Sequence, residues 1–145
     1  MTIKAAKRED LNALCEIEAE AFDENSFALS RRNFLYHIDK NSIFICEIEG
    51  SVAGYILLLT RKNSIRIYSL AVKKEFRSCG VGLKLLEKSI AHAKDRDKKS
   101  INLEVNAANL SAIRLYEKVG FVKTGVALKY YPDGADAVLM EKVLS

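Results

Sequence analysis

The chain reads Ser69-Leu70-Ala71-Val72 and, after four intervening residues, Arg77-Ser78-Cys79-Gly80-Val81-Gly82, which runs into Leu83-Lys84-Leu85-Leu86. An apolar run typical of a β-strand is thus followed by a glycine-containing turn and the start of an amphipathic helix. Such a turn presents backbone N–H groups at a helix N-terminus, where partial positive charge collects. Glycine has no side chain, so a bulky anion can approach the backbone. The stretch therefore predicts a binding site for a phosphate or pyrophosphate group.

Strand and helix patterns alternate along the rest of the chain. Apolar residues at helical spacing predict helices over about Glu9–Ala21, a short stretch after an N-cap at Ser30, Val81–Lys94 and Asn109–Lys118. Runs rich in β-branched and aromatic residues predict strands over Ile3–Ala6, Ile43–Ile48, Val52–Thr60, Ile65–Val72, Ile101–Asn106, Phe121–Tyr130 and Ala137–Val143. This order predicts one α/β domain, residues 1–145, with a mixed sheet.

Composition and charge argue against several functional classes. The longest apolar run, Tyr55 to Leu59, is far shorter than the roughly 20 residues that a bilayer requires. The N-terminal residues Met1 to Lys4 lack the apolar region of a signal peptide. The net charge is +4, and the basic patch Lys94–Lys99 holds two aspartates, whereas a nucleic-acid binder usually carries a stripe of one sign. The three cysteines show no metal-ligand spacing. We expect a cytoplasmic protein without a metal, and no contact with nucleic acid or membrane.

The glycine turn does not fit two common nucleotide-binding motifs. A Rossmann site requires Gly-x-Gly-x-x-Gly, but residue 85 is Leu and not a third glycine. A Walker loop requires Gly-Lys-Ser/Thr, which does not follow. A strand–turn–helix unit can also need its glycines for backbone geometry alone, so the turn by itself leaves the function open.

A second group of residues follows in the predicted strand Ile101–Asn106 and the helix after it. The odd-numbered residues of this strand are apolar and the even-numbered ones, Glu104 among them, are polar, so the two kinds lie on opposite faces. The pattern alone favours a solvent-facing Glu104, a packing role for Tyr116 and a helix stop at Gly120.

Taken in order and spacing, these pieces resemble the GNAT acyl-CoA N-acetyltransferases. The matching pieces are the strand and Arg-x-x-Gly-x-Gly loop, the helix, Leu103-Glu104-Val105, the helix that Asn109 caps with Ala112-Ile113, Leu115-Tyr116-x-x-x-Gly120-Phe121, and Tyr130-Tyr131-Pro132 leading to Asp136–Met140. Within the family the chain is most similar to the RimI-type enzymes, which acetylate the N-terminal alanine of a ribosomal protein. The resemblance covers nearly the whole chain. It implies the GNAT fold, a mixed and mostly antiparallel sheet of about six or seven strands flanked by about four helices.

The resemblance implies acetyl-CoA as co-substrate and assigns its contacts. The backbone amides of the loop would hold the pyrophosphate, with charge added by Arg77; these residues are Arg77, Ser78, Cys79, Gly80, Val81 and Gly82. The strand end Leu70, Ala71 and Val72 would hold the pantetheine arm, and the Val72 N–H would polarise the thioester carbonyl. Asn109 would contact the coenzyme near the start of its helix.

The resemblance also implies catalytic roles. Glu104 would accept the proton of the amine, either directly or through a water, and Tyr116 would supply one to the departing CoA thiolate. We expect direct transfer in a ternary complex without an acyl-enzyme, because Cys79 lies in the phosphate loop, away from the thioester carbon. Tyr130 and Tyr131 would bind substrate on the acceptor side.

The acceptor remains open between classes at this point. The leading hypothesis is the α-amine of a peptide or protein N-terminus, with a ribosomal protein as the partner. The segment Phe22–Leu29, which shapes the acceptor site in the family, lacks the Trp common in the RimI-type enzymes. A small amine is the alternative. It would favour an acidic pocket to which Asp23 and Glu24 could contribute, although the sequence favours a solvated loop for these two residues. A non-catalytic acetyl-CoA-binding module is a third possibility, against which the presence of both Glu104 and Tyr116 argues; a nucleotide-binding regulator lacks the motifs described above.

Overall fold

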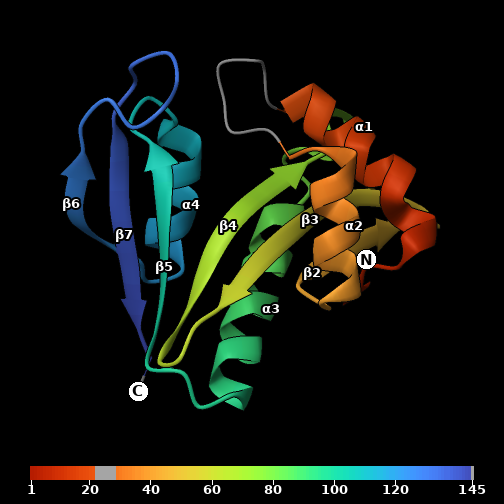
Figure 1. The fold of residues 1–145 in the computed structure, drawn as a ribbon, viewed down its shortest axis with the longest axis horizontal. Coiled ribbons are helices and arrows are strands. Elements are labelled where there is room, and N and C mark those ends of the chain that lie inside the picture. The colour runs from red at the N-terminus through yellow and green to blue at the C-terminus, as the bar shows by residue number, and fades with distance from the viewer. Residues whose placement is uncertain (22–28, 145) are drawn as a thin grey trace.

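The computed structural model describes residues 1–21 and 29–144, and Figure 1 shows their elements. The helices in these residues are α1 (Leu11–Ala21), α2 (Arg31–Asp39), α3 (Val81–Asp95) and α4 (Leu110–Lys118). The strands are β1 (Thr2–Ala5), β2 (Ile43–Ile48), β3 (Ser51–Thr60), β4 (Ser64–Val72), β5 (Ser100–Asn106), β6 (Val122–Ala127) and β7 (Ala137–Val143). Short 3₁₀ turns at Arg8–Asp10 and Lys74–Phe76 precede α1 and follow β4.

The strands form one sheet in the order β1-β2-β3-β4-β5-β7-β6. Within the described part of the chain β4 and β5 pair in parallel, and the other neighbouring strands pair antiparallel. The helix α3 lies between β4 and β5 in the chain, which is the crossover that a parallel pair requires. The expected mixed, mostly antiparallel sheet is confirmed.

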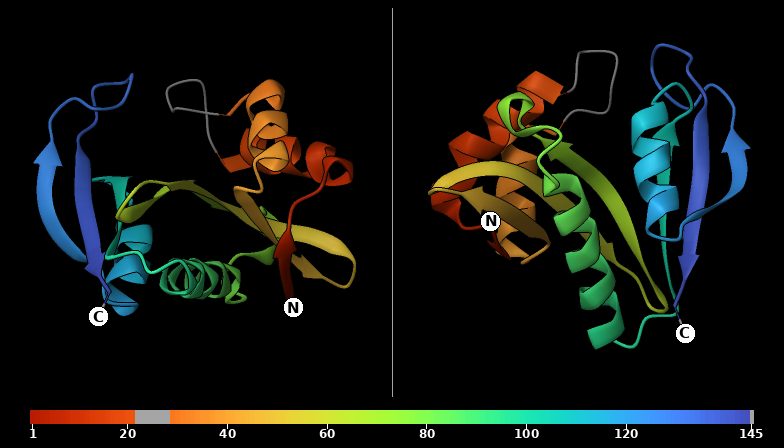
Figure 2. Two further views of the ribbon diagram at one scale, coloured as in Figure 1. Left: turned by 60° about the horizontal axis from the view of Figure 1, so that its bottom comes forward. Right: turned by 180° about the vertical axis from the view of Figure 1, so that it is seen from behind.

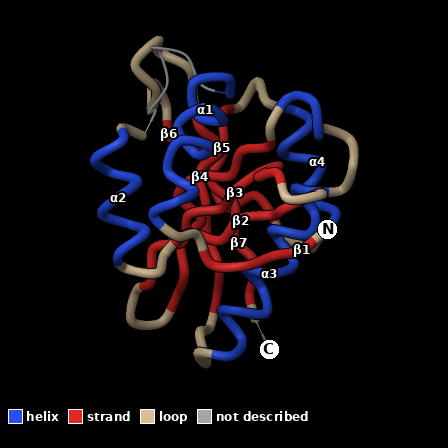
Figure 3. Tube along the Cα trace, turned by 90° about the vertical axis from the view of Figure 1, so that its right-hand side faces the viewer, coloured by secondary structure: helices blue, strands red, loops and turns tan. Residues whose placement is uncertain are grey.

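Helices cover both faces of this sheet. Figure 2 shows α1 and α2 on one face and α3 and α4 on the other, and Figure 3 shows the strands enclosed between them. One core packs Leu14 of α1 and Phe34 of α2 against the sheet, and the other packs Leu85 and Leu86 of α3. These side chains are fully buried, as the helical spacing of the apolar residues predicts.

The sheet opens between β4 and β5. The two strands pair only as far as Ile67 and Leu103. Beyond that point β4 remains paired with β3 up to Val72, while β5 remains paired with β7 up to Asn106. Figure 1 shows the two strands diverging toward their C-terminal ends. The facing edges of the two strands are therefore not joined there by a ladder of hydrogen bonds between them.

A β-bulge lies where this opening begins. On β3 Leu57 and Leu58 are consecutive, but their partners on β4 are Ser69 and Ile67, so Tyr68 is an extra residue in its strand. A bulge bends its strand and increases the local twist. The bulge therefore gives a physical reason for β4 to turn away from β5 at this point.

The local signals for turns and caps are confirmed in several places. Glu49 and Gly50 both have positive φ, the geometry of the tight turn that joins β2 and β3. The Ser30 hydroxyl accepts a hydrogen bond from the Asn33 amide at 3.1 Å and caps α2. Gly120 has φ of 102° just after α4, as expected for a left-handed residue that ends a helix.

The expected strand Phe121–Tyr130 is wrong in its second half. The strand β6 ends at Ala127, so Tyr130 and Tyr131 lie in the connection to β7. Lys129 has a positive φ, and its amide donates to the Asp136 carboxylate at 2.9 Å. These local hydrogen bonds offer the backbone a loop conformation in place of the ladder. The first helix is also shorter than predicted and begins at Leu11, after the 3₁₀ turn.

The helices of the described residues are all too short or too polar to cross a bilayer.

Candidate active site

A cleft of about 1000 Å³ lies where β4 and β5 part. It is lined by residues of β4, the loop before α3, the first turn of α3, β5, α4 and the connection between β6 and β7. Of the residues predicted from the sequence, the cleft brings together Leu70, Ala71, Val72, Arg77, Ser78, Gly80, Val81, Gly82, Glu104, Asn109, Tyr116, Tyr130 and Tyr131. Cys79 does not line it; its side chain is exposed, with Sγ 3.7 Å from the Arg77 carbonyl oxygen.

The loop before α3 has the backbone geometry of an anion-binding turn. Ser78 and Gly80 both have positive φ, and Gly80 is the N-cap residue of α3. Gly80 supplies no side chain to cap the helix, so the amides of the first turn keep their capacity to donate to a ligand. A Cβ on Gly82 would lie 3.0 Å from the Leu115 side chain, which shows how closely α3 approaches α4 here. The arrangement can hold a phosphate at the positive end of a helix of 15 residues.

The edge of β4 that faces the opening carries backbone donors. The Lys73 amide donates to the Ala53 carbonyl at 2.7 Å, so Val72 and Gly54 form a pair without mutual hydrogen bonds. By the alternation of an antiparallel ladder, the amides of Leu70 and Val72 then point away from β3 and toward the opening. Both residues belong to the strand end that the family resemblance predicts for the pantetheine arm.

Glu104 lies on the β5 side of the cleft and is ion-paired. Its Oε2 atom lies 2.9 Å from Nη2 of Arg66, and both side chains are about one-fifth exposed, 23% and 22%. The same Arg66 nitrogen donates to the Tyr130 hydroxyl at 3.2 Å. The pattern of the strand alone favoured a solvent-facing Glu104, and that reading is wrong because the guanidinium of β4 covers the carboxylate.

Arg66 is a residue that the sequence reasoning missed. It is a lone charged residue between Ile65 and Ile67, both buried, in a strand that is otherwise apolar or uncharged. Charged residues are rarely placed in such a strand without a partner, and this signal was present in the sequence. What was missing was the pairing of β4 with β5, which brings Arg66 beside Asn102 and hence near Glu104.

Tyr116 reaches the cleft from α4. Tyr116 is only 7% exposed, and its ring packs edge-on against that of Phe121, with the ring centroids 5.7 Å apart. Burial, with a smaller contribution from Tyr131, raises the pKa of Tyr116 well above its ordinary value. The hydroxyl therefore carries its proton at neutral pH and can donate a hydrogen bond.

Tyr130 and Tyr131 stand at the side of the cleft next to Glu104. Their rings are perpendicular to each other, with centroids 5.0 Å apart. Burial, followed by the influence of Tyr130 and Glu104, raises the pKa of Tyr131 to about 12. The Tyr131 phenol is thus a neutral hydrogen-bonding group over the physiological range.

Asn109 has a structural role in addition to its place in the cleft. Its Oδ1 atom accepts from the Ala112 amide at 3.2 Å and caps α4. Its predicted contact with a coenzyme would therefore use the remaining hydrogen-bond donors and acceptors of the side-chain amide.

Glu18 is a second residue that the sequence reasoning missed. It is 3% exposed on α1, and its carboxylate accepts hydrogen bonds from the Leu29 amide and the Tyr55 hydroxyl. Tyr55 in turn lies 2.8 Å from the hydroxyl of Ser69, which lines the cleft. Burial raises the pKa of Glu18 despite these hydrogen bonds. The network joins α1, Leu29, β3 and β4 behind the cleft wall.

Some predicted acceptor-side residues cannot be placed. Phe22, Asp23 and Glu24 lie outside the described residues. Within residues 1–21 and 29–144, no three His, Cys, Asp or Glu side chains are grouped as they would be around a metal ion.

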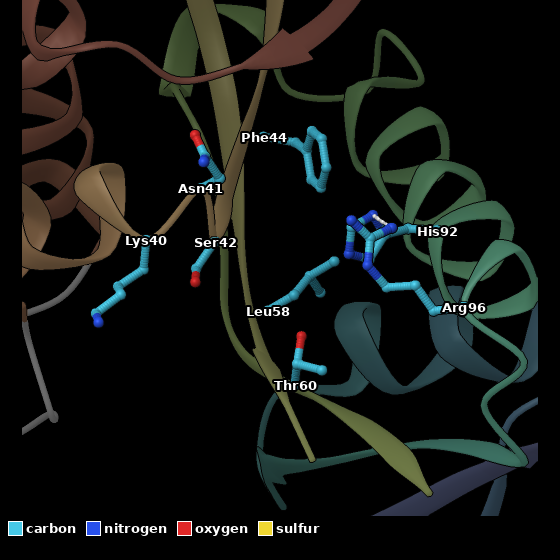
Figure 4. A pocket seen from close by; sticks show the side chains of 8 residues that line it. All are labelled: Lys40, Asn41, Ser42, Phe44, Leu58, Thr60, His92 and Arg96. Carbon is cyan, nitrogen blue, oxygen red and sulfur yellow. Dashed lines mark hydrogen bonds between the residues drawn. The ribbon is translucent and has the colours of Figure 1, made fainter. Parts of the chain in front are cut away.

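A smaller pocket of about 250 Å³ lies away from the cleft, between the turn after α2 and the C-terminal half of α3 (Figure 4). His92 lies in this pocket. Its Nδ1 atom is 3.0 Å from Nη1 of Arg96, and the centroid of its ring is 5.1 Å from the centroid of the Phe44 ring. Burial, with smaller contributions from Arg96 and Lys88, lowers the pKa of His92. His92 is therefore a neutral packing residue at pH 7.

We expect the free energy of unfolding to fall as the pH drops below 6.5, the usual pKa of histidine. The pKa of His92 is lowered in the folded chain, so the unfolded chain binds the proton more readily. The stability that His92 contributes is thus present above pH 6.5 and is lost as the pH falls through its folded pKa. Urea unfolding between neutral pH and about pH 5 measures the slope. The slope should be shallower in His92→Gln, and an unchanged slope would contradict the prediction.

Comparison with known proteins adds a family match, two relatives in sequence and one solved structure. Residues 11–121 match the acetyltransferase (GNAT) family. The chain is 38% identical over 145 residues to an uncharacterized N-acetyltransferase of Methanocaldococcus jannaschii, covering 98% of this chain and 91% of that one. It is 32% identical over 160 residues to an N-alpha-acetyltransferase of Saccharolobus solfataricus, covering 99% and 93%. The crystal structure of the ribosomal-protein-S18-alanine N-acetyltransferase from Escherichia coli superposes with a TM-score of 0.88 at 30% identity, covering 99% and 94%.

Proposed function

The chain belongs to the acetyltransferase (GNAT) family, and from this premise we propose that it moves an acetyl group from acetyl-CoA to the α-amine of a protein N-terminus. The relatives that it matches along nearly their whole length are named N-acetyltransferases, and the chain is an enzyme of that class. One observation carries the proposal. The anion-binding loop, the backbone donors of β4 and two side chains suited to proton transfer line the same cleft.

The charge of the cleft fits a phosphorylated co-substrate. Among the described lining residues Arg66 and the one carboxylate, Glu104, form an ion pair, and the other charged side chains are the cations Arg77 and Lys118. The loop amides and the N-terminus of α3 add partial positive charge. Acetyl-CoA would therefore place its pyrophosphate at Ser78 to Gly82 and its thioester toward Val72.

The proposed reaction is direct attack in a ternary complex. The amine nitrogen forms a bond to the acetyl carbonyl carbon, and the bond from that carbon to sulfur breaks. Glu104 takes the proton that the nitrogen loses, through a water, and Tyr116 donates a hydrogen bond or a proton to the departing thiolate. The Val72 amide, which points into the opening, would stabilise the oxyanion that develops on the carbonyl.

The α-amine is favoured over a small polycation as acceptor. A polyamine or an aminoglycoside is best held by unpaired carboxylates. The described lining offers one carboxylate, which already has a cationic partner, while Asp23 and Glu24 lie outside the described residues. The names of the relatives from Saccharolobus solfataricus and Escherichia coli support an N-terminal amine, with alanine of a ribosomal protein as the leading candidate.

The test is CoA release from acetyl-CoA with a panel of acceptors. The panel holds a peptide that begins with alanine and contains a lysine, the same peptide with its α-amine blocked, and a polyamine. We expect turnover on the peptide with the α-amine and none on its blocked form. Turnover confined to the polyamine would overturn the proposal, and acetyl-CoA binding without turnover on any acceptor would favour a binding module.

A further inference from the structure

Arg66 connects two elements on the acceptor side of the cleft. A single guanidinium nitrogen, Nη2, lies 2.9 Å from the Glu104 carboxylate and 3.2 Å from the Tyr130 hydroxyl. Glu104 belongs to β5, and Tyr130 belongs to the connection between β6 and β7. Arg66 lies on β4 and therefore bridges two residues of other elements. One is Glu104, the proposed proton acceptor, and the other is Tyr130, which we expect to bind the amine substrate.

The surroundings of Arg66 hold its guanidinium in the cleft wall. Its Cζ atom lies 5.6 Å from the centroid of the Tyr68 ring, the bulged residue of the same strand. Its Nε atom is buried and has no hydrogen-bond partner among the described residues. A half-buried guanidinium is weakly screened by solvent, so its attraction for a carboxylate at 2.9 Å is stronger than at an exposed site.

The backbone of Glu104 does not need Arg66 to be held in place. β5 is paired with β7 along its whole length, from Ser100 to Asn106. The side chain of a glutamate still has three rotatable bonds, and these are what the guanidinium restrains. A contact that orients the carboxylate but is not needed to hold the backbone affects the rate of a reaction more than the stability of the fold.

We propose that Arg66 is a positioning residue, which orients the Glu104 carboxylate toward the attacking amine and couples it to Tyr130. This inference rests on the proposed function, because it assigns Glu104 the role of proton acceptor. It also gives Arg66 a role in the rate of the reaction and none in the binding of acetyl-CoA, whose predicted contacts are Leu70 to Val72, the loop Arg77 to Gly82, and Asn109.

The test is a double-mutant cycle with Arg66→Met and Glu104→Gln, measured with acetyl-CoA and the N-terminal peptide. We expect Arg66→Met to lower kcat about 10- to 100-fold, as a misplaced reacting group does, with the Kd of acetyl-CoA unchanged within about twofold. In the Glu104→Gln background the same substitution should change kcat by less than about threefold. Arg66→Lys retains a charge and should keep a higher kcat than Arg66→Met.

The controls separate this inference from the proposed function. Arg8→Met removes an exposed ion pair, Arg8 with Asp39 at 2.7 Å, outside the cleft, and should leave kcat unchanged. Wild-type kcat in Arg66→Met, or the same loss in both backgrounds, would overturn the positioning role while wild-type turnover still supported the proposed function. Absence of turnover by the wild-type protein on every acceptor would overturn the proposed function itself, and the positioning role with it.

Discussion

Glu104→Gln should lower kcat by about 10²-fold, the usual contribution of a general base. The amide keeps the shape of the side chain but cannot accept the proton that the amine must lose. The Kd of acetyl-CoA should stay within about twofold, because Glu104 lies on the acceptor side and not at the loop before α3. Steady-state kinetics with the N-terminal peptide, together with calorimetric titration of acetyl-CoA, separate the two effects.

The chain offers a matched control for this variant. Glu47 is a strand glutamate with a side chain 22% exposed and a lysine partner, Lys4, at 3.0 Å. Its exposure is nearly that of Glu104, but it lies on β2, away from the cleft. Glu47→Gln should leave kcat unchanged, since it loses an ion pair of the same kind without touching the reaction. Equal rates for Glu104→Gln and the wild type would show that Glu104 does not carry the proton.

Tyr116→Phe should also lower kcat about 10²-fold, since it removes the hydroxyl that we propose as the donor to the departing thiolate. The ring that packs against Phe121 is retained, so the fold should be preserved. Because burial raises the pKa of Tyr116 well above its ordinary value, the hydroxyl keeps its proton through mildly alkaline pH. The loss in the variant should therefore be similar at neutral and mildly alkaline pH, which kcat measured across that range will show.

Two further measurements complete the Tyr116 experiment. Tyr36→Phe removes a phenol from an exposed residue of α2 and should leave both kcat and the thermal midpoint unchanged. A more acidic thiol is a better leaving group and depends less on a proton donor. The loss of kcat in Tyr116→Phe should therefore be smaller with an acyl donor whose thiol is more acidic. Wild-type kcat in Tyr116→Phe would remove the residue from the mechanism.

The elements and their order could be predicted from the sequence because their signals are local. Helical spacing of apolar residues, the N-cap at Ser30 and the positive φ of Gly80 and Gly120 each depend on a few neighbouring residues. The prediction failed where two local preferences competed. The residues after Ala127 look like a continued strand, but the Asp136 carboxylate binds the Lys129 amide and stabilises a loop.

The predicted site residues were found through the order and spacing of motifs, and the cleft brings all but Cys79 of them together. Arg66 and Glu18 were missed because the partner of each lies far along the chain. The Arg66 contact with Tyr130 spans 64 positions, and the Glu18 contact with Tyr55 spans 37. No periodicity within one strand or helix reports such a pair.

The sequence by itself determined the family resemblance, the strand–loop–helix that can hold a pyrophosphate and the residue types available for proton transfer. Those features depend on neighbouring residues and on backbone geometry that glycine permits. Only the tertiary structure decided that β4 parts from β5 after Ile67, and that Arg66 covers the Glu104 carboxylate there. The reason is physical: the direction of a side chain and the charge that faces it depend on strand pairing and on a bulge, which join residues distant in sequence.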